Sequence, residues 1–472
     1  MKLSRVMIAA PKSGSGKTMA VCALLQILKD RGQPAVSCKC GPDYIDPMFH
    51  EAVIQVPTRN LDTFFTGEEQ TKELLAEDRK EGDIAILEGV MGLFDGLGGI
   101  REEGSSYHLA KVTDTPIVLI VDAKGMGRSV IPLIAGFLAY DDRHLIQGVI
   151  LNRISKSWYE ILKPLAEEEL GTKMLGYLPE QKELHMESRH LGLVMPHEIS
   201  SVQKQLRILS GRFAETVCVE EILHIAGDAR TLQVRGRIEK SPPHETVTIG
   251  VARDEAFCFY YEDNLRMLRE CGARIRYFSP IHDVKIPEGC DGLLLGGGYP
   301  ELYAKELGSN ISMCRAVKKA ICKGMPVVAE CGGFMYLHSS ITDQEGNHHD
   351  MAGVIPGSCT FTGKLVRFGY IELKEKTGRF LDNNGTIKGH EFHYYDSTNN
   401  GADCFAIKPV TNGTYSCIIE GENYWLGFPH LYYPSNPTFP ERFVEMAQKY
   451  KERGMLNESG NKNCSNWNHC RR

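Results

Sequence analysis

The sequence predicts an α/β fold divided into two domains. Continuous apolar runs recur along the chain, and such runs are typical of strands buried on both faces of a parallel sheet. Helical stretches with one apolar face separate these runs, as in repeated strand–helix–strand units. A chain of 472 residues is also too long for a single hydrophobic core. We therefore expect two α/β domains.

In the first half, the apolar runs predict four strands, and a segment with one apolar face predicts a helix over 18–32 that ends at Gly32. The pattern fades over 225–246, which is polar, contains Pro242 and Pro243, and is typical of an interdomain linker. Four further strands are then predicted. The strands are expected at 5–11, 83–89, 116–123, 147–153, 247–252, 273–279, 292–298 and 326–331.

These patterns set the expected domain boundaries. The first domain should cover 1–228 and the second 246–455, with a linker over 229–245 between them. The end of the chain, 456–472, is polar, and we expect it to be disordered.

Composition narrows the class of protein. The chain is 42% hydrophobic and 24% charged, its net charge is −6, and it has no long basic run, which argues against nucleic acid as the main partner. The apolar run before Pro11 is too short for a signal peptide, and no apolar stretch reaches the roughly 18 residues of a membrane span. We expect a cytoplasmic protein without a membrane partner. Its 15 cysteines contain no C-x-x-C pair, and most should be reduced core residues.

The segment PKSGSGKT (11–18) predicts a nucleotide-binding loop between the first strand and its helix. Gly14 and Gly16 let backbone N–H groups close around phosphates, Lys17 supplies positive charge, and Thr18 offers a hydroxyl to Mg²⁺. Pro11 stands where the strict pattern has glycine, so the loop is a variant. Lys12 matches the extra lysine of dethiobiotin synthetase relatives and partition-type ATPases, although a solvated loop lysine fits equally well.

Acidic residues follow at positions suited to Mg-ATP. Glu88 ends a strongly apolar strand and Asp95 comes seven residues later; a carboxylate so placed needs a charge partner, and a metal ion is favoured. Asp43 and Asp46 lie in the proline-flanked segment KCGPDYIDPMFH (39–50). Their spacing alone fits either ligands or a turn stabilised by local hydrogen bonds.

These motifs, followed by GVILNR (148–153) and SRHLGLV (188–194), closely resemble the cobyrinate a,c-diamide synthase family of ATP- and glutamine-dependent amidating enzymes in cobalamin synthesis. The resemblance runs from residue 3 to about 450 and is carried above all by GPDYIDP and GVMGLFDG. It implies a dethiobiotin synthetase-like phosphate-loop domain followed by a class I glutamine amidotransferase domain. It further implies that Asp43 and Glu88, with Thr18, hold Mg²⁺. Asp46 and Asp95 would serve phosphoryl transfer to the substrate, and Asn152 would contact the adenine.

The second domain carries a predicted cysteine nucleophile. GMPVVAECGGFMYL (324–337) is an apolar strand ending at Cys331, followed by two glycines and a helical start. Such a turn exposes the thiol at the sheet edge, and we expect the adjoining helix N-terminus to lower its pKa. Backbone N–H groups near Gly297 and Gly298 are candidate oxyanion donors. A packed core cysteine is the alternative.

His430 is the expected base for this cysteine, since it follows at the long range found in class I glutamine amidotransferases. Those enzymes usually read H-x-E, whereas Tyr432 stands here at the glutamate position, as in the corrinoid amidase branch. The group that orients His430 is therefore open. His390 and His393 are expected to be structural, because no third metal ligand is evident.

The resemblance implies amidation of the a and c carboxylates of cobyrinate with ATP and L-glutamine, with Mg²⁺ as cofactor. Nickel sirohydrochlorin or hydrogenobyrinate are alternative substrates. A partition-type switch ATPase with an inactive second domain is the alternative from another class; Lys12 favours it slightly, and the Cys331–His430 pair argues against it.

Overall fold

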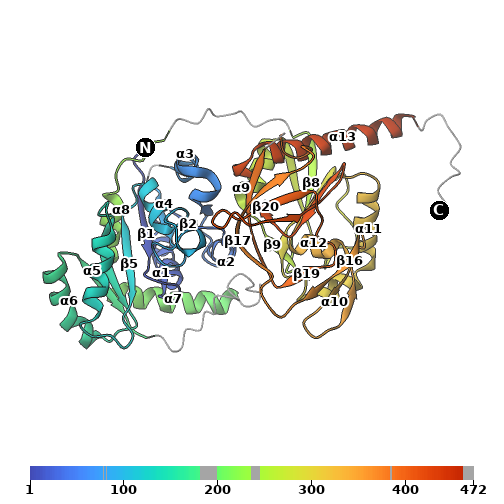
Figure 1. Cartoon of the computed structure of the whole chain (residues 1–472). Helices are drawn as coiled ribbons and strands as arrows, with labels where there is room; N and C mark the ends of the chain where they lie inside the picture. Colours follow the sequence, from blue (N-terminus) through green and yellow to red (C-terminus); the bar gives the residue numbers. More distant parts are fainter. Residues whose placement is uncertain (78, 81, 181–198, 235–244, 383–384, 461–472) are drawn as a thin grey trace. The chain divides into compact units, whose positions relative to one another are not determined.

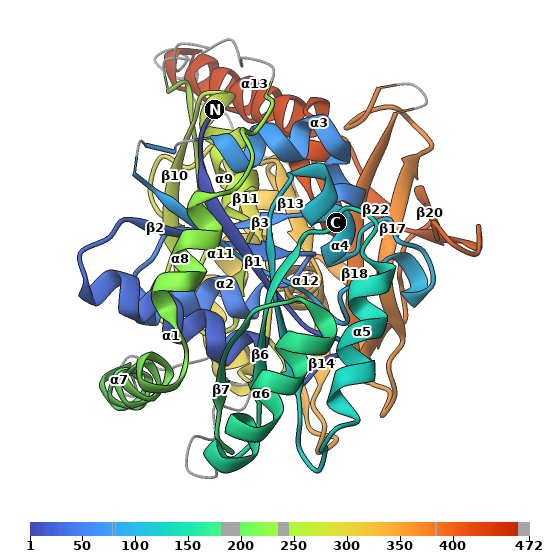
Figure 2. The same ribbon diagram turned by 90° about the vertical axis from the view of Figure 1, so that its left-hand side faces the viewer.

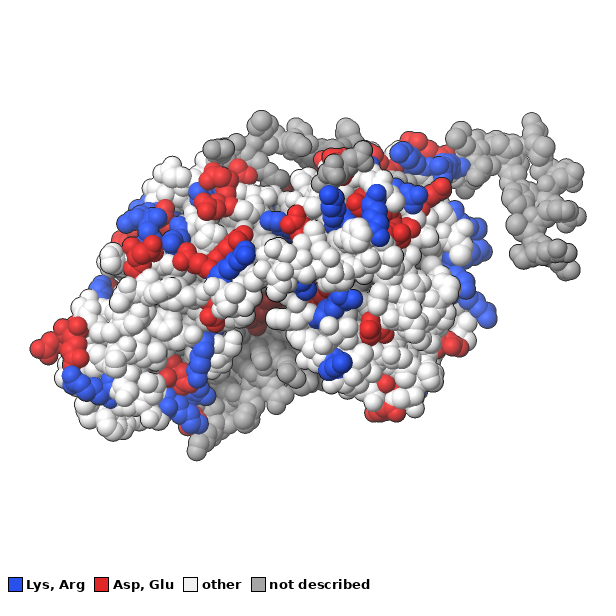
Figure 3. All heavy atoms as spheres, in the orientation of Figure 1, with Lys and Arg blue, Asp and Glu red and all other residues white. Residues whose placement is uncertain are grey.

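The computed structural model describes residues 1–77, 79–80, 82–180, 199–234, 245–382 and 385–460 (Figure 1). The chain separates into two compact units, 1–238 and 239–472, each with its own sheet and core. No helix in these ranges is both long enough and apolar enough to cross a lipid bilayer. On the face drawn in Figure 3, acidic and basic side chains are interspersed rather than gathered into one large patch.

The first unit is built on a parallel sheet of seven strands in the order β3-β2-β4-β1-β5-β6-β7. The predicted α/β class is confirmed, and the four predicted strands are present with small shifts at their ends. The strands are β1 (Ser4–Ala9), β2 (Ala35–Cys40), β3 (Thr58–Leu61), β4 (Ile84–Glu88), β5 (Ile117–Asp122), β6 (Ile146–Asn152) and β7 (Met174–Leu178).

Helices cover both faces of this sheet, which is why most of its strands are apolar. Figure 2 shows α1, α7 and α8 on one side and α4, α5 and α6 on the other. The helices and helical turns are α1 (Lys17–Asp30), α2 (Ile45–Phe49), η1 (His50–Ile54), α3 (Thr63–Ala76), η2 (Leu97–Gly99), α4 (Ser106–Val112), α5 (Val130–Tyr140), α6 (Lys156–Leu170), α7 (Ile199–Thr216) and α8 (Val219–Gly227).

Three strands of the first unit, β2, β3 and β7, are absent from the sequence prediction. Their sequences, AVSCKC, TRNL and MLGYL, are short, and the first two contain polar residues that break the apolar run. β2 is nevertheless buried between β3 and β4, and it carries Lys39 into the interior. Tertiary pairing, rather than local pattern, makes this segment a strand.

The second unit has a six-stranded sheet in the order β10-β8-β11-β13-β23-β22, which is parallel except at the β22 edge. Two further sheets, β15-β14-β16-β19 and β21-β20-β17-β18-β24, come from the region after the nucleophile turn. The strands are β8 (Val247–Ala252), β9 (Phe257–Phe259), β10 (Ala273–Phe278), β11 (Gly292–Leu295), β12 (Gly297–Gly298), β13 (Val327–Glu330), β14 (His338–Thr342), β15 (His348–Asp350), β16 (Ile355–Phe361), β17 (Arg367–Glu375), β18 (Thr386–His393), β19 (Tyr395–Ser397), β20 (Cys404–Ile407), β21 (Thr414–Cys417), β22 (Ile419–Glu420), β23 (Tyr424–Gly427) and β24 (His430–Leu431).

The helices of this unit begin with α9 and end with a long α13 after β24. They are α9 (Glu262–Glu270), α10 (Ala304–Ser309), α11 (Ile311–Cys322), α12 (Gly332–Leu337), η4 (Tyr433–Ser435) and α13 (Thr438–Gly460). Because α13 continues to Gly460, the start of the predicted tail is helical. The remainder of that tail, 461–472, lies outside the described residues.

The predicted linker begins packed against the first unit. Leu232 is buried, and its backbone N–H donates to the carbonyl of Met1 at 2.9 Å. Arg5 donates to the carbonyl of Arg230 at 2.6 Å. Residues 235–244 of that segment lie outside the described residues.

Candidate active sites

The phosphate loop joins β1 to α1 in the first unit. Gly14 and Gly16 adopt positive φ angles of 75° and 98°. A Cβ at Gly16 would lie 2.3 Å from Nδ2 of Asn152, and that amide donates to the carbonyl of Ser15 at 2.8 Å. Asn152, at the end of β6, therefore braces the loop backbone directly, a contact that the sequence did not predict.

Lys17 begins α1, and its side chain is largely buried. Its ammonium donates to the carbonyl of Met91 at 2.6 Å and to that of Lys12 at 3.4 Å. Burial, together with the charge of Lys39, lowers the pKa of Lys17 to about 8. Lys12, in contrast, is largely exposed, and its ammonium lies 3.9 Å from Asp122.

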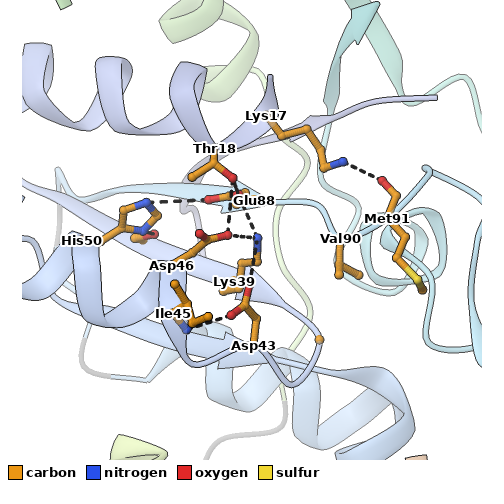
Figure 4. Close-up of polar contacts among 12 residues, drawn as sticks. Lys17, Thr18, Lys39, Asp43, Ile45, Asp46, His50, Glu88, Val90 and Met91 are labelled. Carbon is orange, nitrogen blue, oxygen red and sulfur yellow. Dashed lines mark hydrogen bonds and ion pairs between the residues drawn. The ribbon is translucent and has the colours of Figure 1, made fainter. Parts of the chain in front are cut away.

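A cluster of charged side chains lies beside Thr18 (Figure 4). The Thr18 hydroxyl donates to Glu88 Oε1 at 2.7 Å and reaches Asp46 Oδ2 at 3.4 Å. The Lys39 ammonium donates to Glu88 Oε1 at 2.8 Å, contacts Asp46, and lies 3.6 Å from Asp43. The structure thus brings together Thr18 and three of the four predicted acids around one lysine.

Charge and burial compete inside this cluster. Lys39 and Glu88 are fully enclosed, and burial raises the pKa of the Glu88 carboxyl. Burial also opposes ionisation of Asp46, but the adjacent Lys39 ammonium outweighs it and holds the pKa of that carboxyl below its ordinary value. Lys39 itself is disfavoured by burial, yet the surrounding carboxylates raise its pKa, so it stays charged.

The cluster fits a magnesium ion. Thr18, Asp46 and Glu88 present hard oxygen atoms, the donors that Mg²⁺ prefers. Glu88 Oε2 is buried and has no hydrogen-bond partner among the described residues, which is a costly arrangement unless a cation completes it. Asp46, rather than Asp43, is the aspartate that contacts Thr18; Asp43 lies further out, where its carboxylate accepts from the N–H of Ile45 at 2.8 Å.

Asp95 lies on the turn after β4 and holds that turn together. Its carboxylate accepts from the N–H of Gly92 at 2.9 Å. Its charge also acts on Lys17, whose contact with Met91 belongs to the same turn. Asp95 therefore stabilises the turn that contacts Lys17, and its part in phosphoryl transfer stays a prediction.

Two residues of the cluster escaped the sequence analysis. Lys39 sits in a strand that the sequence did not predict, and His50 lies 3.7 Å from Glu88 through Nε2 while its Nδ1 lies 2.8 Å from the Ser37 hydroxyl. The lysine between two cysteines in AVSCKC was the available signal, since a buried ammonium needs carboxylate partners. The family segment 188–194 lies outside the described residues.

In the second unit, Cys331 occupies the sharp turn between β13 and α12. Its backbone is strained, with φ 45° and ψ −100°, and its N–H donates to the carbonyl of Gly427 at 2.8 Å. This is the geometry expected of a nucleophile turn. The expected lowering of its pKa is wrong for the resting protein: burial, reinforced by the charge of Glu301, raises the pKa of the thiol.

The predicted oxyanion turn packs against both the cysteine turn and the histidine. A Cβ at Gly297 would lie 2.3 Å from Cε1 of His430, and one at Gly332 would lie 3.2 Å from the backbone nitrogen of Gly298. Only residues without a side chain allow this close approach. The fold therefore brings three separate segments together: the turn at Cys331, the turn at Gly297 and Gly298, and the strand that begins at His430.

His430 begins β24 and is buried. Its ring stacks on His390 of the paired strand β18, with centroids 5.0 Å apart. Burial, followed by the neighbouring His390 and His393, lowers the pKa of His430 well below its ordinary value, so the imidazole is neutral and able to accept a proton. Tyr432, at the position where related enzymes carry glutamate, instead donates to Asp263 at 2.9 Å.

His393 has packing contacts of its own. Its ring stacks on Phe428 with centroids 4.0 Å apart, and its Nδ1 lies 2.7 Å from the carbonyl of Tyr395. No group of three or more His, Cys, Asp or Glu side chains placed to hold a metal ion occurs within the described ranges. None of the thirteen cysteines in those ranges forms a disulfide, and most are buried, in line with reduced core residues.

One unit carries a phosphate loop with an acid cluster, and the other carries a cysteine and a histidine placed for nucleophilic catalysis. Together they define a class: amide-forming ligases that take nitrogen from glutamine. Comparison with protein families agrees. Residues 6–194 match the CobQ/CobB/MinD/ParA nucleotide binding domain, and 248–430 match the CobB/CobQ-like glutamine amidotransferase domain.

Curated relatives cover nearly the whole chain. The cobyrinate a,c-diamide synthase of Caldanaerobacter subterraneus is 39% identical over 94% of this chain and 98% of its own length. Those of Thermoplasma volcanium and Priestia megaterium are 37% and 36% identical, each over 96% of this chain and 99% of the relative. The chain belongs to the cobyrinate a,c-diamide synthase family. It is an enzyme that forms carbon–nitrogen bonds with glutamine as the amido donor.

Proposed function

We propose that this enzyme converts the a and c acetate side chains of cobyrinate to amides, consuming ATP and L-glutamine. The observation that carries the proposal is the presence of two complete and different sets of reactive groups on one chain. One set suits phosphoryl transfer to a carboxylate, and the other suits release of ammonia from an amide.

The glutamine half-reaction begins with the neutral His430 imidazole accepting the proton of the Cys331 thiol. The sulfur attacks the side-chain carbonyl carbon of glutamine, and backbone N–H groups of the Gly297–Gly298 turn are suited to stabilise the oxyanion. The carbon–nitrogen bond breaks, the proton on His430 passes to the leaving nitrogen, and ammonia departs. Water then hydrolyses the thioester to glutamate and restores the thiol.

The amidation half-reaction uses the first unit. Lys17 and the loop N–H groups bind the phosphates, and the substrate carboxylate attacks the γ-phosphorus, releasing ADP and forming an acyl phosphate. Ammonia then attacks the acyl carbon and inorganic phosphate leaves. Thr18, Asp46 and Glu88 would hold Mg²⁺, which neutralises charge on the transferred phosphate when bound. Asp43 and Asp95 complete the acidic surroundings.

Lys39 has two roles in this acid cluster. With its ammonium 2.8 Å from Glu88, it also holds the pKa of the Asp46 carboxyl below its ordinary value, so that Asp46 is ionised before any metal ion arrives. The same ammonium is a donor suited to an incoming carboxylate or phosphate oxygen. We propose that this ammonium donates a hydrogen bond to the reacting carboxylate of the substrate or to the phosphate that is transferred to it.

The test is to incubate the enzyme with ATP, Mg²⁺ and glutamine together with cobyrinate, hydrogenobyrinate or nickel sirohydrochlorin, and to read the products by mass. Each carboxylate converted to an amide lowers the mass by about 1 Da. Cobyrinate should give a diamide and stoichiometric ADP and glutamate. Turnover of nickel sirohydrochlorin or hydrogenobyrinate with cobyrinate left unchanged would reject cobyrinate as the substrate.

A further inference from the structure

Glu330 is a buried acid that directly precedes the nucleophile Cys331 and has no role in the reaction as described so far. It ends β13, and only 7% of its side chain is exposed. Its Oε2 lies 3.9 Å from Nδ1 of His430. A carboxylate at this position is where cysteine and serine hydrolases place the group that orients their histidine.

The backbone fixes this arrangement from two strands. Glu330 lies on β13, whose partner β23 leads through Phe428 and Pro429 into β24, where His430 begins the strand. The N–H of Leu431, the next residue along β24, donates to the Glu330 carboxylate. The carboxylate is therefore tied by a main-chain N–H to the same short strand that carries the imidazole.

One oxygen of this carboxylate is otherwise unused. Glu330 Oε1 is buried and has no hydrogen-bond partner within the described ranges. Burial raises the pKa of this carboxyl to about 8, so its ionised form is costly without a charged partner, which argues for a partner that appears during the reaction. A histidine that becomes positively charged when it takes the thiol proton is such a partner.

The alternatives around His430 are less suited. Tyr432, at the H-x-E position, points its hydroxyl to Asp263 instead. His390 stacks nearly parallel to the His430 ring, with an interplanar angle of 18°, so it lies over the face of the ring and not in line with its nitrogens. The Glu330 carboxyl group, in contrast, lies next to a ring nitrogen of His430, Nδ1.

We propose that Glu330 is the positioning residue of the glutaminase site: it holds the Nδ1 proton of His430, leaves Nε2 free for the thiol of Cys331, and stabilises the imidazolium that forms. In this chain an acid next to the nucleophile replaces the glutamate that related enzymes carry two residues after the histidine. The proposal rests on the glutamine half-reaction set out above, and it does not depend on which macrocycle is amidated.

The variant Glu330→Gln keeps the shape of the side chain and removes its charge. Glutamine hydrolysis, measured as glutamate release, should fall about 100-fold or more in kcat with little change in KM, because substrate binding is untouched. Activity with high free ammonium should stay within about twofold of the parent enzyme. Glutamine hydrolysis within about threefold of the parent would overturn the proposal.

Alkylation of Cys331 by iodoacetamide at pH 7 supplies a second readout that a merely structural role would not move. Loss of a nearby negative charge by itself favours the thiolate and should speed alkylation. Loss of the group that prepares His430 as a base should slow it. Slower alkylation of Glu330→Gln supports the proposal, and faster alkylation contradicts it.

Glu301→Gln is the matched control, because Glu301 is the acid whose charge acts most strongly on Cys331. It should alkylate faster and keep glutamine hydrolysis. Glu330→Asp covers the case in which Glu330→Gln fails to fold. It retains the charge, and its rate of glutamine hydrolysis should be at least tenfold higher than that of Glu330→Gln. A folded Glu330→Asp variant that is as inactive as Cys331→Ser would reject the role. If the parent enzyme itself released no glutamate, the glutamine half-reaction would be at fault and not Glu330.

Discussion

The Lys39 ammonium lies 2.8 Å from Oε1 of Glu88, and both side chains are sealed from solvent. The same Glu88 oxygen accepts the hydroxyl hydrogen of Thr18 from the phosphate loop at 2.7 Å. The site that we propose for Mg-ATP is thus preorganised around an internal cation. Asp46 can stay ionised before a metal ion or nucleotide binds, at the expense of burying an ammonium.

Lys39→Met should destabilise the first unit, because it leaves Asp46 and Glu88 without their buried cation. We expect a loss of about 3–5 kcal/mol in the free energy of unfolding at pH 7. Millimolar Mg²⁺ should restore more stability to the variant than it gives to the parent. Urea denaturation with and without Mg²⁺ measures both effects. Lys156→Met removes an exposed lysine paired with Glu160 and should change stability by about 0.5 kcal/mol or less.

Cys331→Ser should abolish amidation with glutamine and retain amidation with high free ammonium, since the thiol serves only the glutamine half-reaction. Product analysis by mass with each nitrogen source makes the comparison. Cys322→Ser, at an exposed cysteine of the same unit, should leave both activities unchanged. Loss of both activities in Cys331→Ser with the fold intact would contradict the division of labour.

Lys17→Met should have the opposite effect. Amidation should fall about 100-fold or more with either nitrogen source, because the phosphates lose their buried cation. Glutamine hydrolysis should persist, since it needs neither ATP nor the phosphate loop. Lys156→Met, at a lysine whose side chain is 74% exposed, should behave like the parent. An unchanged rate of ADP formation in Lys17→Met would remove this residue from the site.

Gly297→Ala tests the packing of the glycine turn. The added methyl carbon would lie 2.3 Å from Cε1 of His430, so the imidazole must shift and glutamine hydrolysis should fall at least tenfold. Activity with ammonium should persist. Gly454→Ala in α13 meets no atom within 4 Å and should stabilise slightly or be neutral. Full glutaminase activity in Gly297→Ala would show that the turn can move away from His430.

Acid should destabilise the protein through His390. Burial lowers the pKa of His390 to about 3, whereas an unfolded histidine titrates near pH 6.5. Between these values the unfolded chain binds the extra proton, so stability is full above about pH 6.5 and falls as the pH drops toward 3. The slope from this residue is at most about 1.4 kcal/mol per pH unit.

The check is to follow urea unfolding of the second unit between pH 4 and 7 in His390→Gln. The variant should show a shallower loss of stability toward low pH than the parent. His348→Gln, at an exposed histidine, should leave the slope unchanged. Parallel pH profiles for the parent and His390→Gln would show that His390 is not held neutral.

The local chemistry of the chain could be predicted from its sequence. Buried parallel strands can be recognised in the sequence as apolar runs. The PKSGSGKT loop and the Cys331 turn can also be recognised, because each depends on residues adjacent in the chain. The edge strand β3 and the polar β2 could not, because their pairing partners are distant in sequence and supply the burial that their own residues do not signal.

Only the tertiary structure decided which side chains meet. Lys39, Asp46 and Glu88 come from β2, α2 and β4, and no spacing along the chain states that their charges converge. The helix that follows Cys331 in the sequence predicts a lowered pKa for its thiol. Burial by the surrounding residues instead raises that pKa. The approach of Glu330 to His430 likewise arises from strands one hundred residues apart. The sequence by itself determines the secondary structure and the reactive groups of each segment. The charge state and the partners of those groups depend on residues that only the tertiary structure places beside them.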